Sequence, residues 1–362
     1  MLMPNKNSKV AVVVSGFPRR SETFMLGELL ALEASGTLAA VFATKTGELG
    51  QAQPGTERLA RYVELLPDGT VEEQARAIRH TLANQRVDGV HGYFAHRPAE
   101  VAQHAAQMLG VPFGFSVHAR DLRKVTPDAF RQRASAAACV VTCNTDVARD
   151  LHDLGTRSHL LPHGVDLRRF TPQSSPANGT LRLLAVGRLV EKKGFHLLIA
   201  ALAGLKLPFM LTIVGDGPER ERLQQLIVIN NLQTRVILHG PATHAELPQI
   251  YARSEIVIVP SIQDRSGDRD GLPNVVLEAM ACGRAVIASD AGAIASAISD
   301  NENGLLVPAA DPAALAEAIR RLAANKALRG QLGRNGRERA ERDYEVGRCS
   351  KRFHQLLTSV YA

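Results

Sequence analysis

Tryptophan is absent from this 362-residue chain, and aromatic residues together make up only 4% of it. Proteins that stack nucleic-acid bases need aromatic platforms, which this composition does not supply. The net charge is +7, but basic and acidic residues are spread along the whole chain rather than gathered in one basic face or tail. Both features argue against a nucleic-acid-binding protein, whereas attraction to anionic substrates or membrane surfaces stays compatible with the charge.

Cysteine is also scarce, and none of the four cysteines shows Cys-x-x-Cys spacing: Cys139, Cys143, Cys282 and Cys349. Cys139 and Cys143 lie in an apolar run with no histidine at the local spacing of a metal site, so we expect buried free thiols in a reducing compartment. No apolar run approaches the ~20 residues of a membrane span. The short apolar run at 10–14 lacks a signal-peptide cleavage site, and we therefore expect a cytoplasmic protein.

Two common catalytic patterns are missing as well. The chain has no Gly-x-x-x-x-Gly-Lys-Ser/Thr phosphate loop, and no Ser-His-Asp or Cys-His unit that would indicate acyl transfer. Gly215-Asp216-Gly217 superficially resembles a dinucleotide fingerprint, but Arg220 stands where the third glycine would be. A nicotinamide-dependent dehydrogenase is therefore only weakly supported.

Short apolar runs that end at glycine or proline alternate with segments of helical periodicity in both halves of the chain. This alternation predicts parallel, doubly wound sheets, and the length favours two domains. Residues 162–180 change character, from Pro162-His163-Gly164-Val165-Asp166 to a segment at 171–180 rich in Pro, Ser, Asn and Gly, and form the candidate linker. We predict domains at 1–170 and 171–342, a strand region at 134–143, and a terminal helix at 343–362 that crosses back to the N-terminal domain.

In such sheets, ligands bind at the carboxyl ends of the strands. Gly16, His96 and His118 each follow a predicted strand of the first half, so we expect them at one edge of the sheet. An ordinary structural histidine is the alternative for His96 and His118.

The stretch 267–283 combines an acidic, glycine-bearing loop with an apolar helix that ends at Gly283. Pro273 is predicted at the first helical position, with Asp270 just before the helix and Glu278 inside it. A helix N-terminus presents N–H groups and positive dipole, which suit a phosphate or a sugar, and two nearby acids could hold hydroxyls. The alternative is an ordinary capped helix beside a solvated acidic loop.

Arg188 and Lys193 lie in a predicted strand-to-helix turn between Gly187 and Gly194. A planar guanidinium and a point-like ammonium at a sheet edge can clamp a diphosphate. The alternative is an ordinary basic loop whose side chains are solvated, and we expect the Lys192 side chain to be solvated in this way.

Taken together, these segments resemble retaining glycosyltransferases of family 4, also described as glycosyl transferases group 1. The matching segments are 186–194, 214–218, 270–289 and 303–307, with 162–166 resembling the interdomain segment. Within the first half, 17–24, 93–96 and 115–121 are similar to bacterial exopolysaccharide transferases of the colanic-acid and amylovoran type. The resemblance implies an α/β GT-B fold, in which two Rossmann-like domains, one on the acceptor side and one that binds the donor, face each other across a cleft.

The resemblance also implies roles for individual residues. Arg188 and Lys193 would grip the donor diphosphate, Glu278 would bind the ribose hydroxyls, and Asp270 would meet the donor sugar. His118 would contact that sugar from the opposite domain. Residues 239–243 and Pro260-Ser261 would line the base pocket, and His96 would contact the sugar or the acceptor. Further donor contacts would come from Gly16, Gly187, Gly271, Leu272, Pro273 and Asn274. No metal or other cofactor is expected, since Arg and Lys neutralise the leaving diphosphate.

Two departures from the family pattern stand out: Asp270 replaces the commoner Glu, and the first loop has the single Gly16. The implied activity is transfer of a hexose from a UDP- or GDP-sugar to a saccharide or lipid-linked saccharide, in exopolysaccharide or glycoconjugate biosynthesis, with peripheral membrane contact for a lipid-linked acceptor. A nucleotide-sugar epimerase of the same fold and a non-catalytic sugar-nucleotide-binding protein are the alternatives.

Overall fold

The computed structural model describes residues 8–19, 22–48, 53–118, 121–174 and 179–362. The chain forms two compact units, Met1–Gly164 with Val346–Ala362, and Val165–Glu345. The first boundary therefore lies inside the candidate linker but before the predicted domain start at 171: Val165 pairs with Glu345, its N–H donating to the Tyr344 carbonyl at 2.7 Å, and Phe170 is buried in the C-terminal core. The second boundary lies at 345, not 342, because the same pairing holds Tyr344 and Glu345 in the C-terminal unit.

The N-terminal unit contains a seven-stranded parallel sheet of order β3-β2-β1-β4-β5-β6-β7. Its strands are β1 (Val10–Phe17), β2 (Leu38–Thr46), β3 (Val63–Leu65), β4 (Gly89–Tyr93), β5 (Phe113–Val117), β6 (Cys139–Thr142) and β7 (His159–Leu160). Residues of β1 alternate between two cores, as the period of two in a strand requires, so both faces of the sheet are buried.

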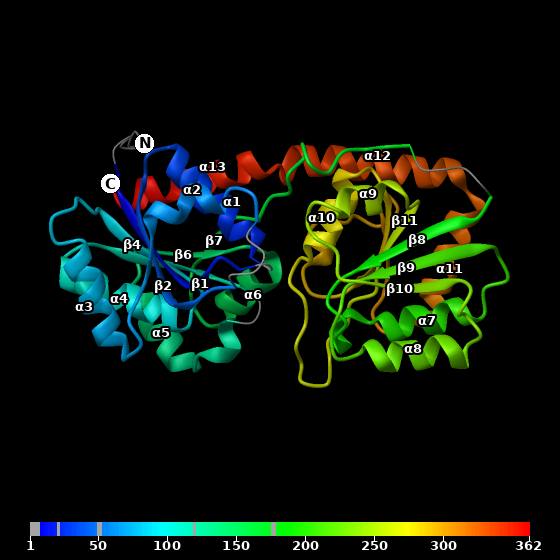
Figure 1. The fold of residues 1–362 in the computed structure, drawn as a ribbon, viewed down its shortest axis with the longest axis horizontal. Helices are drawn as coiled ribbons and strands as arrows, with labels where there is room; N and C mark the ends of the chain where they lie inside the picture. Colours follow the sequence, from blue (N-terminus) through cyan, green and yellow to red (C-terminus); the bar gives the residue numbers. More distant parts are fainter. Residues whose placement is uncertain (1–7, 20–21, 49–52, 119–120, 175–178) are drawn as a thin grey trace. The chain divides into compact units, whose positions relative to one another are not determined.

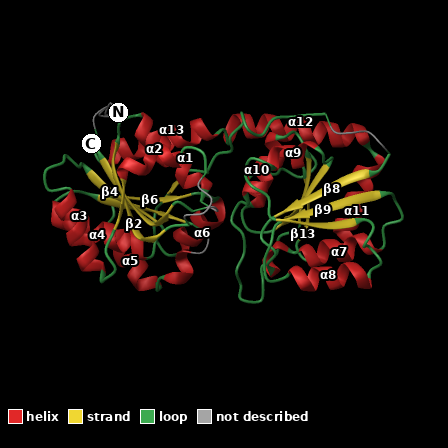
Figure 2. Cartoon of the chain, viewed as in Figure 1, coloured by secondary structure: helices red, strands yellow, loops and turns green. Residues whose placement is uncertain are grey.

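Helices cover both faces of this sheet, as Figure 2 shows. One face packs against α3 (Val71–Thr81), α4 (Arg97–Leu109), α5 (Pro127–Ala136) and α6 (Thr145–Asp153), and the other against α1 (Thr23–Ala34), α2 (Thr56–Leu59) and α13 (Val346–Val360). Tyr361 anchors the end of the chain. Its ring packs so closely against Gly89 that a Cβ added at Gly89 would lie only 2.4 Å from the nearest ring carbons. Its hydroxyl is 3.1 Å from His91 Nδ1.

The C-terminal unit contains a six-stranded parallel sheet of order β10-β9-β8-β11-β12-β13 (Figure 1). Its strands are β8 (Leu181–Val186), β9 (Phe209–Val214), β10 (Val236–Gly240), β11 (Ile256–Val259), β12 (Ala285–Asp290) and β13 (Leu305–Pro308). The helices are α7 (Phe195–Ala203), α8 (Arg220–Ile229), α9 (Leu247–Ala252), α10 (Asn274–Ala281), α11 (Pro312–Ala324) and α12 (Lys326–Asp343). Two apolar cores lie on either side of the sheet.

Two local predictions need correction. The predicted strand region 134–143 begins as helix, because α5 is capped by the Thr126 side chain and continues through helix-favouring alanines to Ala136, so that β6 starts only at Cys139. Pro273 is the residue before α10 rather than its first residue, with an extended ψ of 133°. No helix among the described residues is long and apolar enough to cross a membrane.

Candidate functional site

Lys193 and Asp270, which the sequence assigns to one site, are in direct contact in the C-terminal unit. Lys193 Nζ donates to Asp270 Oδ2 at 2.7 Å, and the Ser261 hydroxyl donates to the same oxygen at 2.9 Å. Lys192 Nζ lies 3.3 Å from both Asp270 Oδ1 and Asp268 Oδ2. The prediction of a solvated Lys192 is therefore wrong, because its side chain is only 14% exposed and its charge is paired with these two acids.

The electrostatics of this cluster keep Asp270 ionised. Burial by itself would raise the pKa of this carboxyl, but the charges of Lys193 and Lys192, with hydrogen bonds from Lys193 and Ser261, outweigh it and lower the pKa below its ordinary value. Asp270 is thus a carboxylate at neutral pH, able to accept hydrogen bonds but not to donate one.

The loop that carries Lys193 can approach this position because of a glycine. Lys193 ends a short 3-10 helix, η3 (Glu191–Lys193), and Gly194 follows in the left-handed conformation with φ 64°. A Cβ at Gly194 would lie only 1.8 Å from the Pro260 carbonyl oxygen, just beyond β11. Glycine is therefore required where the loop meets the end of that strand.

A second glycine, Gly292, fixes the backbone of Asp270. Its φ is 58°, and a Cβ there would lie 2.0 Å from the Asp270 carbonyl oxygen. The sequence analysis did not select Gly292, although its position two residues after β12 places it at the same sheet edge. Ser261, which the family resemblance assigns to the base pocket, contacts the Asp270 carboxylate.

Arg188 and Gly187 follow β8 at the carboxyl edge of the sheet. A Cβ at Gly187 would lie 3.3 Å from Lys193 Cε, so this backbone passes close to the lysine stem. Arg188 is exposed and forms no ion pair with an acid in the described parts of the chain. The structure thus brings Gly187 to Lys193 and leaves the guanidinium in solvent.

The segment from Gly271 to Asn274 leads into α10. Gly271 and Leu272 are partly exposed, Pro273 is buried, and Asn274 is exposed. Pro273 has no side-chain oxygen that could cap the helix, and its carbonyl accepts from Val276 N at 3.0 Å. The positive end of the α10 dipole therefore lies directly after the Asp270 loop.

Glu278 lies within α10 and is only 7% exposed. The Tyr251 hydroxyl donates to its Oε2 at 2.8 Å, and His244 Nε2 lies 3.7 Å from Oε1. Burial and the neighbouring Glu278 raise the pKa of Tyr251 well above its ordinary value, which keeps this phenol protonated as a donor. The sequence analysis missed Tyr251 and His244, since neither stands in a recognisable motif.

The N-terminal unit holds the other predicted residues. His118 directly follows β5, and its ring centroid lies 4.9 Å from that of Phe24 and 4.8 Å from that of Phe94. His96 precedes α4, with Nε2 3.3 Å from Lys124 Nζ. Gly16 lies inside β1, and a Cβ there would crowd two carbonyl oxygens of β2 at 3.1 and 3.2 Å. A packing constraint thus accounts for glycine at position 16.

Three of the four cysteines are buried as predicted, whereas Cys143 is partly exposed. Burial raises the pKa of Cys139 to about 11 and that of Cys282 to about 12, so these thiols stay protonated at neutral pH. Cys143 differs because it follows β6 at the carboxyl edge of the sheet rather than lying inside the strand.

Two family models match adjoining parts of this chain. The model of Glycosyltransferase Family 4 matches residues 23–169, and the model of Glycosyl transferases group 1 matches residues 168–339. The second match contains the Lys193–Asp270 cluster and Glu278, and the first contains His118 and His96.

Two curated relatives and one solved structure illustrate the similarity. WcaL of Escherichia coli K12, named for colanic acid biosynthesis, is 32% identical over 54% of this chain and 50% of its own length. The amylovoran biosynthesis glycosyltransferase AmsK of Erwinia amylovora is 35% identical over 45% of this chain and 41% of its own length. The chain therefore spans about half the length of these relatives.

The Anabaena protein Alr3699/HepE, solved in complex with UDP, superposes with a TM-score of 0.82 at 18% identity, covering 97% of this chain and 100% of that one. This likeness concerns the fold alone, and it agrees with the two parallel sheets observed here, so the predicted α/β GT-B fold class is confirmed. With both family models matched in order along the sequence, the chain belongs to the family 4, group 1 glycosyltransferases.

Proposed function

We propose that this chain is a retaining glycosyltransferase that moves a hexose from a UDP- or GDP-sugar to a saccharide or lipid-linked saccharide in exopolysaccharide or glycoconjugate biosynthesis. The observation that carries the proposal is the partly buried contact between Lys193 and Asp270, which lies directly before α10. The cluster combines a cation for phosphate, a carboxylate for hydroxyls and a helix N-terminus. The names of the relatives support exopolysaccharide as the product class.

In the proposed reaction, the donor diphosphate replaces Asp270 as the ion-pair partner of Lys193. Lys193 and the exposed Arg188 then face the phosphates, and Asp270 becomes the acceptor for a hydroxyl of the donor sugar. As the bond between the anomeric carbon and the leaving phosphate breaks, negative charge grows on the diphosphate, where these cations and the α10 dipole stabilise it. The sugar passes through an oxocarbenium-like state. The acceptor oxygen then bonds to the anomeric carbon on the face from which the phosphate leaves, and the departing phosphate takes the proton of the acceptor hydroxyl.

Charge stabilisation by Lys193 and Arg188 makes a metal ion unnecessary for the leaving group in this proposal. Glu278 would accept the ribose hydroxyls, and Tyr251 would hold its carboxylate in place through the 2.8 Å hydrogen bond. His118, His96 and Gly16 stay assigned to the sugar, the acceptor and the phosphates as the family resemblance implies.

A thermal-shift panel of UDP-, GDP-, ADP- and dTDP-sugars would identify the donor nucleotide, with UDP tested first because a protein of this fold was solved with it. Transfer is then measured with the identified donor in Lys193→Ala, with Lys206→Ala, an exposed lysine of the same unit, as the matched control. We expect Lys193→Ala to lower kcat/KM about 100- to 1000-fold, as removal of a charge-stabilising donor does. Unchanged turnover in a folded Lys193→Ala would refute the assignment.

The same assays separate the two alternatives. Turnover of the donor without any acceptor would indicate an epimerase, and nucleotide binding without hydrolysis or transfer to any saccharide would indicate a non-catalytic binding protein.

A further inference from the structure

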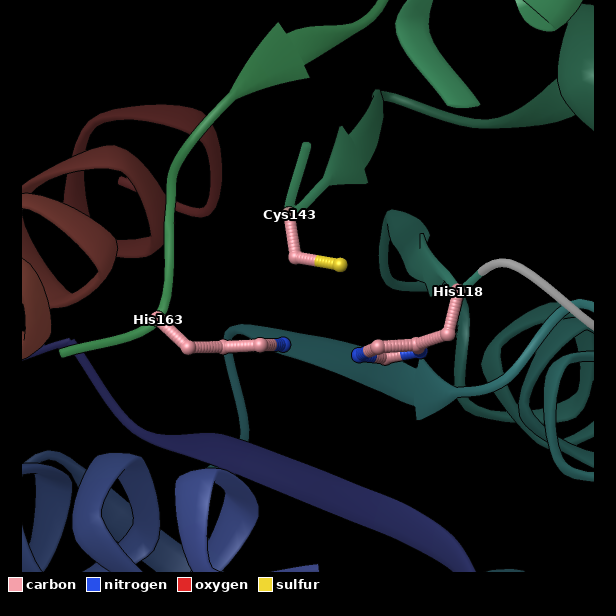
Figure 3. Close-up of side chains that lie close together, drawn as sticks. All are labelled: His118, Cys143 and His163. Carbon is pink, nitrogen blue, oxygen red and sulfur yellow. The ribbon is translucent and has the colours of Figure 1, made fainter. Parts of the chain in front are cut away.

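His118, Cys143 and His163 converge at the carboxyl edge of the N-terminal sheet. His118 directly follows β5, Cys143 directly follows β6, and His163 lies three residues after β7. These strands are consecutive in the sheet, so the segments that follow them are neighbours. One ligand atom from each side chain lies within 4.8 Å of the other two. Figure 3 shows nitrogens of the two imidazoles facing each other, with the Cys143 sulfur beside the gap.

A small cavity of about 10 Å³ lies among these three side chains. Such a volume is about that of one water-sized sphere, and it therefore suits a single ion or water. The remaining lining residues are the polar Glu28, Ser116 and Thr142 and the apolar Val117, Val141, Leu161 and Phe353. The cavity thus offers two imidazoles and one sulfur within a wall of mixed polarity.

The ring of His163 is oriented as a ligand. Its Nδ1 lies 3.1 Å from Glu28 Oε1, so the carboxylate favours the tautomer with the proton on Nδ1 and the lone pair on Nε2. Nε2 is buried, and no described residue supplies it with a hydrogen-bond partner. Glu28 is itself held by the Tyr93 hydroxyl, and burial together with Glu28 raises the pKa of Tyr93, which stays a donor. A carboxylate behind a ligating histidine is the usual arrangement at metal sites.

Cys143 lies directly before a helix. The next residue, Asn144, is the N-cap of α6, and its side-chain amide donates to the Cys143 sulfur at 3.3 Å. This contact fixes the position of the sulfur beside the two imidazoles. Unlike the three other cysteines, Cys143 is not buried.

Aromatic packing holds the two imidazoles. The Phe24 ring stacks on His163 at a centroid distance of 4.0 Å and lies 4.9 Å from His118. The two histidine rings are themselves nearly parallel, at 5.3 Å and 11°. The rings are thus positioned before any ion arrives, which reduces the entropy lost on binding.

We propose that His118, Cys143 and His163 form a binding site for a thiophilic divalent metal ion, for which Zn²⁺ is the best chemical match. Two imidazoles and one thiolate are typical zinc ligands, and they leave one tetrahedral position open for water or an oxygen of a ligand. With zinc–ligand bonds of about 2.0–2.3 Å, two ligand atoms on one ion are roughly 3.5 Å apart. The ligand atoms of the three side chains now lie within 4.8 Å of one another, so small side-chain rotations bring them to the spacing that one ion requires. Binding releases the Cys143 thiol proton.

The site lies in the N-terminal unit and goes beyond the proposed function. One consequence does rest on that function: a metal-bound His118 could not also contact the donor sugar, so Zn²⁺ would inhibit transfer. Metal binding is therefore measured without nucleotide, so that its failure and the failure of the proposed function stay distinguishable.

The test uses the full chain, treated with a chelator and then titrated with Zn²⁺ or Co²⁺. We expect one ion per chain in equilibrium dialysis, and a thiolate-to-metal charge-transfer band with Co²⁺. Cys143→Ser should abolish that band, and His163→Ala should weaken Zn²⁺ binding by about 100-fold or more, since even residues behind the ligands contribute about 10- to 100-fold. Glu28→Gln should cost about 10-fold for the same reason.

His159→Ala is the matched control, because His159 is an exposed histidine of β7 outside the cluster and its loss should leave the affinity unchanged. A second measurement needs no variant: Zn²⁺ should protect Cys143 from alkylation, as mapped by mass spectrometry. Failure of the unmodified chain to bind one ion, binding that survives both Cys143→Ser and His163→Ala, or no protection of Cys143 would overturn the proposal.

Discussion

Replacing Tyr251 by phenylalanine removes one hydroxyl from the core of the C-terminal unit. That hydroxyl donates at 2.8 Å to Oε2 of Glu278, a carboxylate that is only 7% exposed, and Tyr251 itself is fully buried. The ring, and with it the packing, is retained. The effect of Tyr251→Phe therefore isolates one hydrogen bond to a buried charge.

The expected loss in the free energy of unfolding is about 1.5–3 kcal/mol, the range for hydrogen bonds to charged groups. His244 lies 3.7 Å from the other carboxylate oxygen, too far to replace the lost donor without rearrangement. For a unit of this size, the loss corresponds to a decrease in Tm of roughly 3–12 °C. Nucleotide binding should weaken as well, because the carboxylate proposed to hold the ribose loses its support.

Thermal and urea unfolding, followed by circular dichroism, would measure the stability, and calorimetric titration would measure the nucleotide affinity. Tyr62→Phe is the matched control, because in the described part of the chain the hydroxyl of Tyr62 has a hydrogen bond only with the exposed Arg61, at 3.3 Å, and we expect no change in stability there. In a double-mutant cycle with Glu278→Gln, the two losses should not add. A Tyr251→Phe protein as stable as the unmodified chain would refute this reasoning.

Three further perturbations have defined outcomes. Gly292→Ala should lower the free energy of unfolding of the C-terminal unit by at least about 1–3 kcal/mol, as measured by urea unfolding, and should weaken donor binding. The reason is that a φ of 58° is unfavourable for alanine and that the new Cβ would lie 2.0 Å from the Asp270 carbonyl oxygen. Because the pKa of Asp270 is lowered in the folded state, this carboxylate contributes stability that is complete above about pH 5 and is lost as the pH falls below about 4, the ordinary pKa of an aspartate. Asp270→Asn should therefore lose less stability than the unmodified chain between pH 7 and pH 3, as measured by urea titrations. Tyr361→Ala should destabilise the N-terminal unit by about 3–5 kcal/mol in thermal unfolding. Tyr361→Phe keeps the ring and loses only the hydroxyl, with its contacts to His91 Nδ1 at 3.1 Å and the Val90 carbonyl at 3.4 Å, and should cost about 1 kcal/mol.

The alternation of apolar runs and helical periods was sufficient to predict the two parallel sheets, because such runs have few other ways to bury both faces. The domain boundary was less predictable. Residues 165–170 look like the start of a linker, yet Val165 pairs with Glu345 and Phe170 fills the core. Both contacts join segments far apart in the sequence, and local composition does not encode such pairings.

The same distinction holds for the sites. Glycines around Lys193 and the proline before α10 marked the two segments of the Lys193–Asp270 cluster from local sequence alone. Lys192 was assigned to solvent, because nothing local reveals that Asp268 and Asp270 fold back onto it. Cys143 had no histidine at metal-ligand spacing, but His118 and His163 reach it from the ends of neighbouring strands. Spacing rules for metal sites assume one loop or hairpin and do not apply to ligands gathered by a parallel sheet.

Charge balance connects the two lysines with the unusual aspartate. In the unliganded cluster, Lys192 and Lys193 face Asp268 and Asp270, so two positive charges meet two negative ones. A bound diphosphate adds negative charge that this neutral set cannot compensate, whereas the exposed Arg188 supplies a further cation. If Lys193 turns to the phosphate, Lys192 and Ser261 still hold Asp270. The shorter acid therefore keeps its position and its ionised state, and one of its oxygens gains the capacity to accept a sugar hydroxyl.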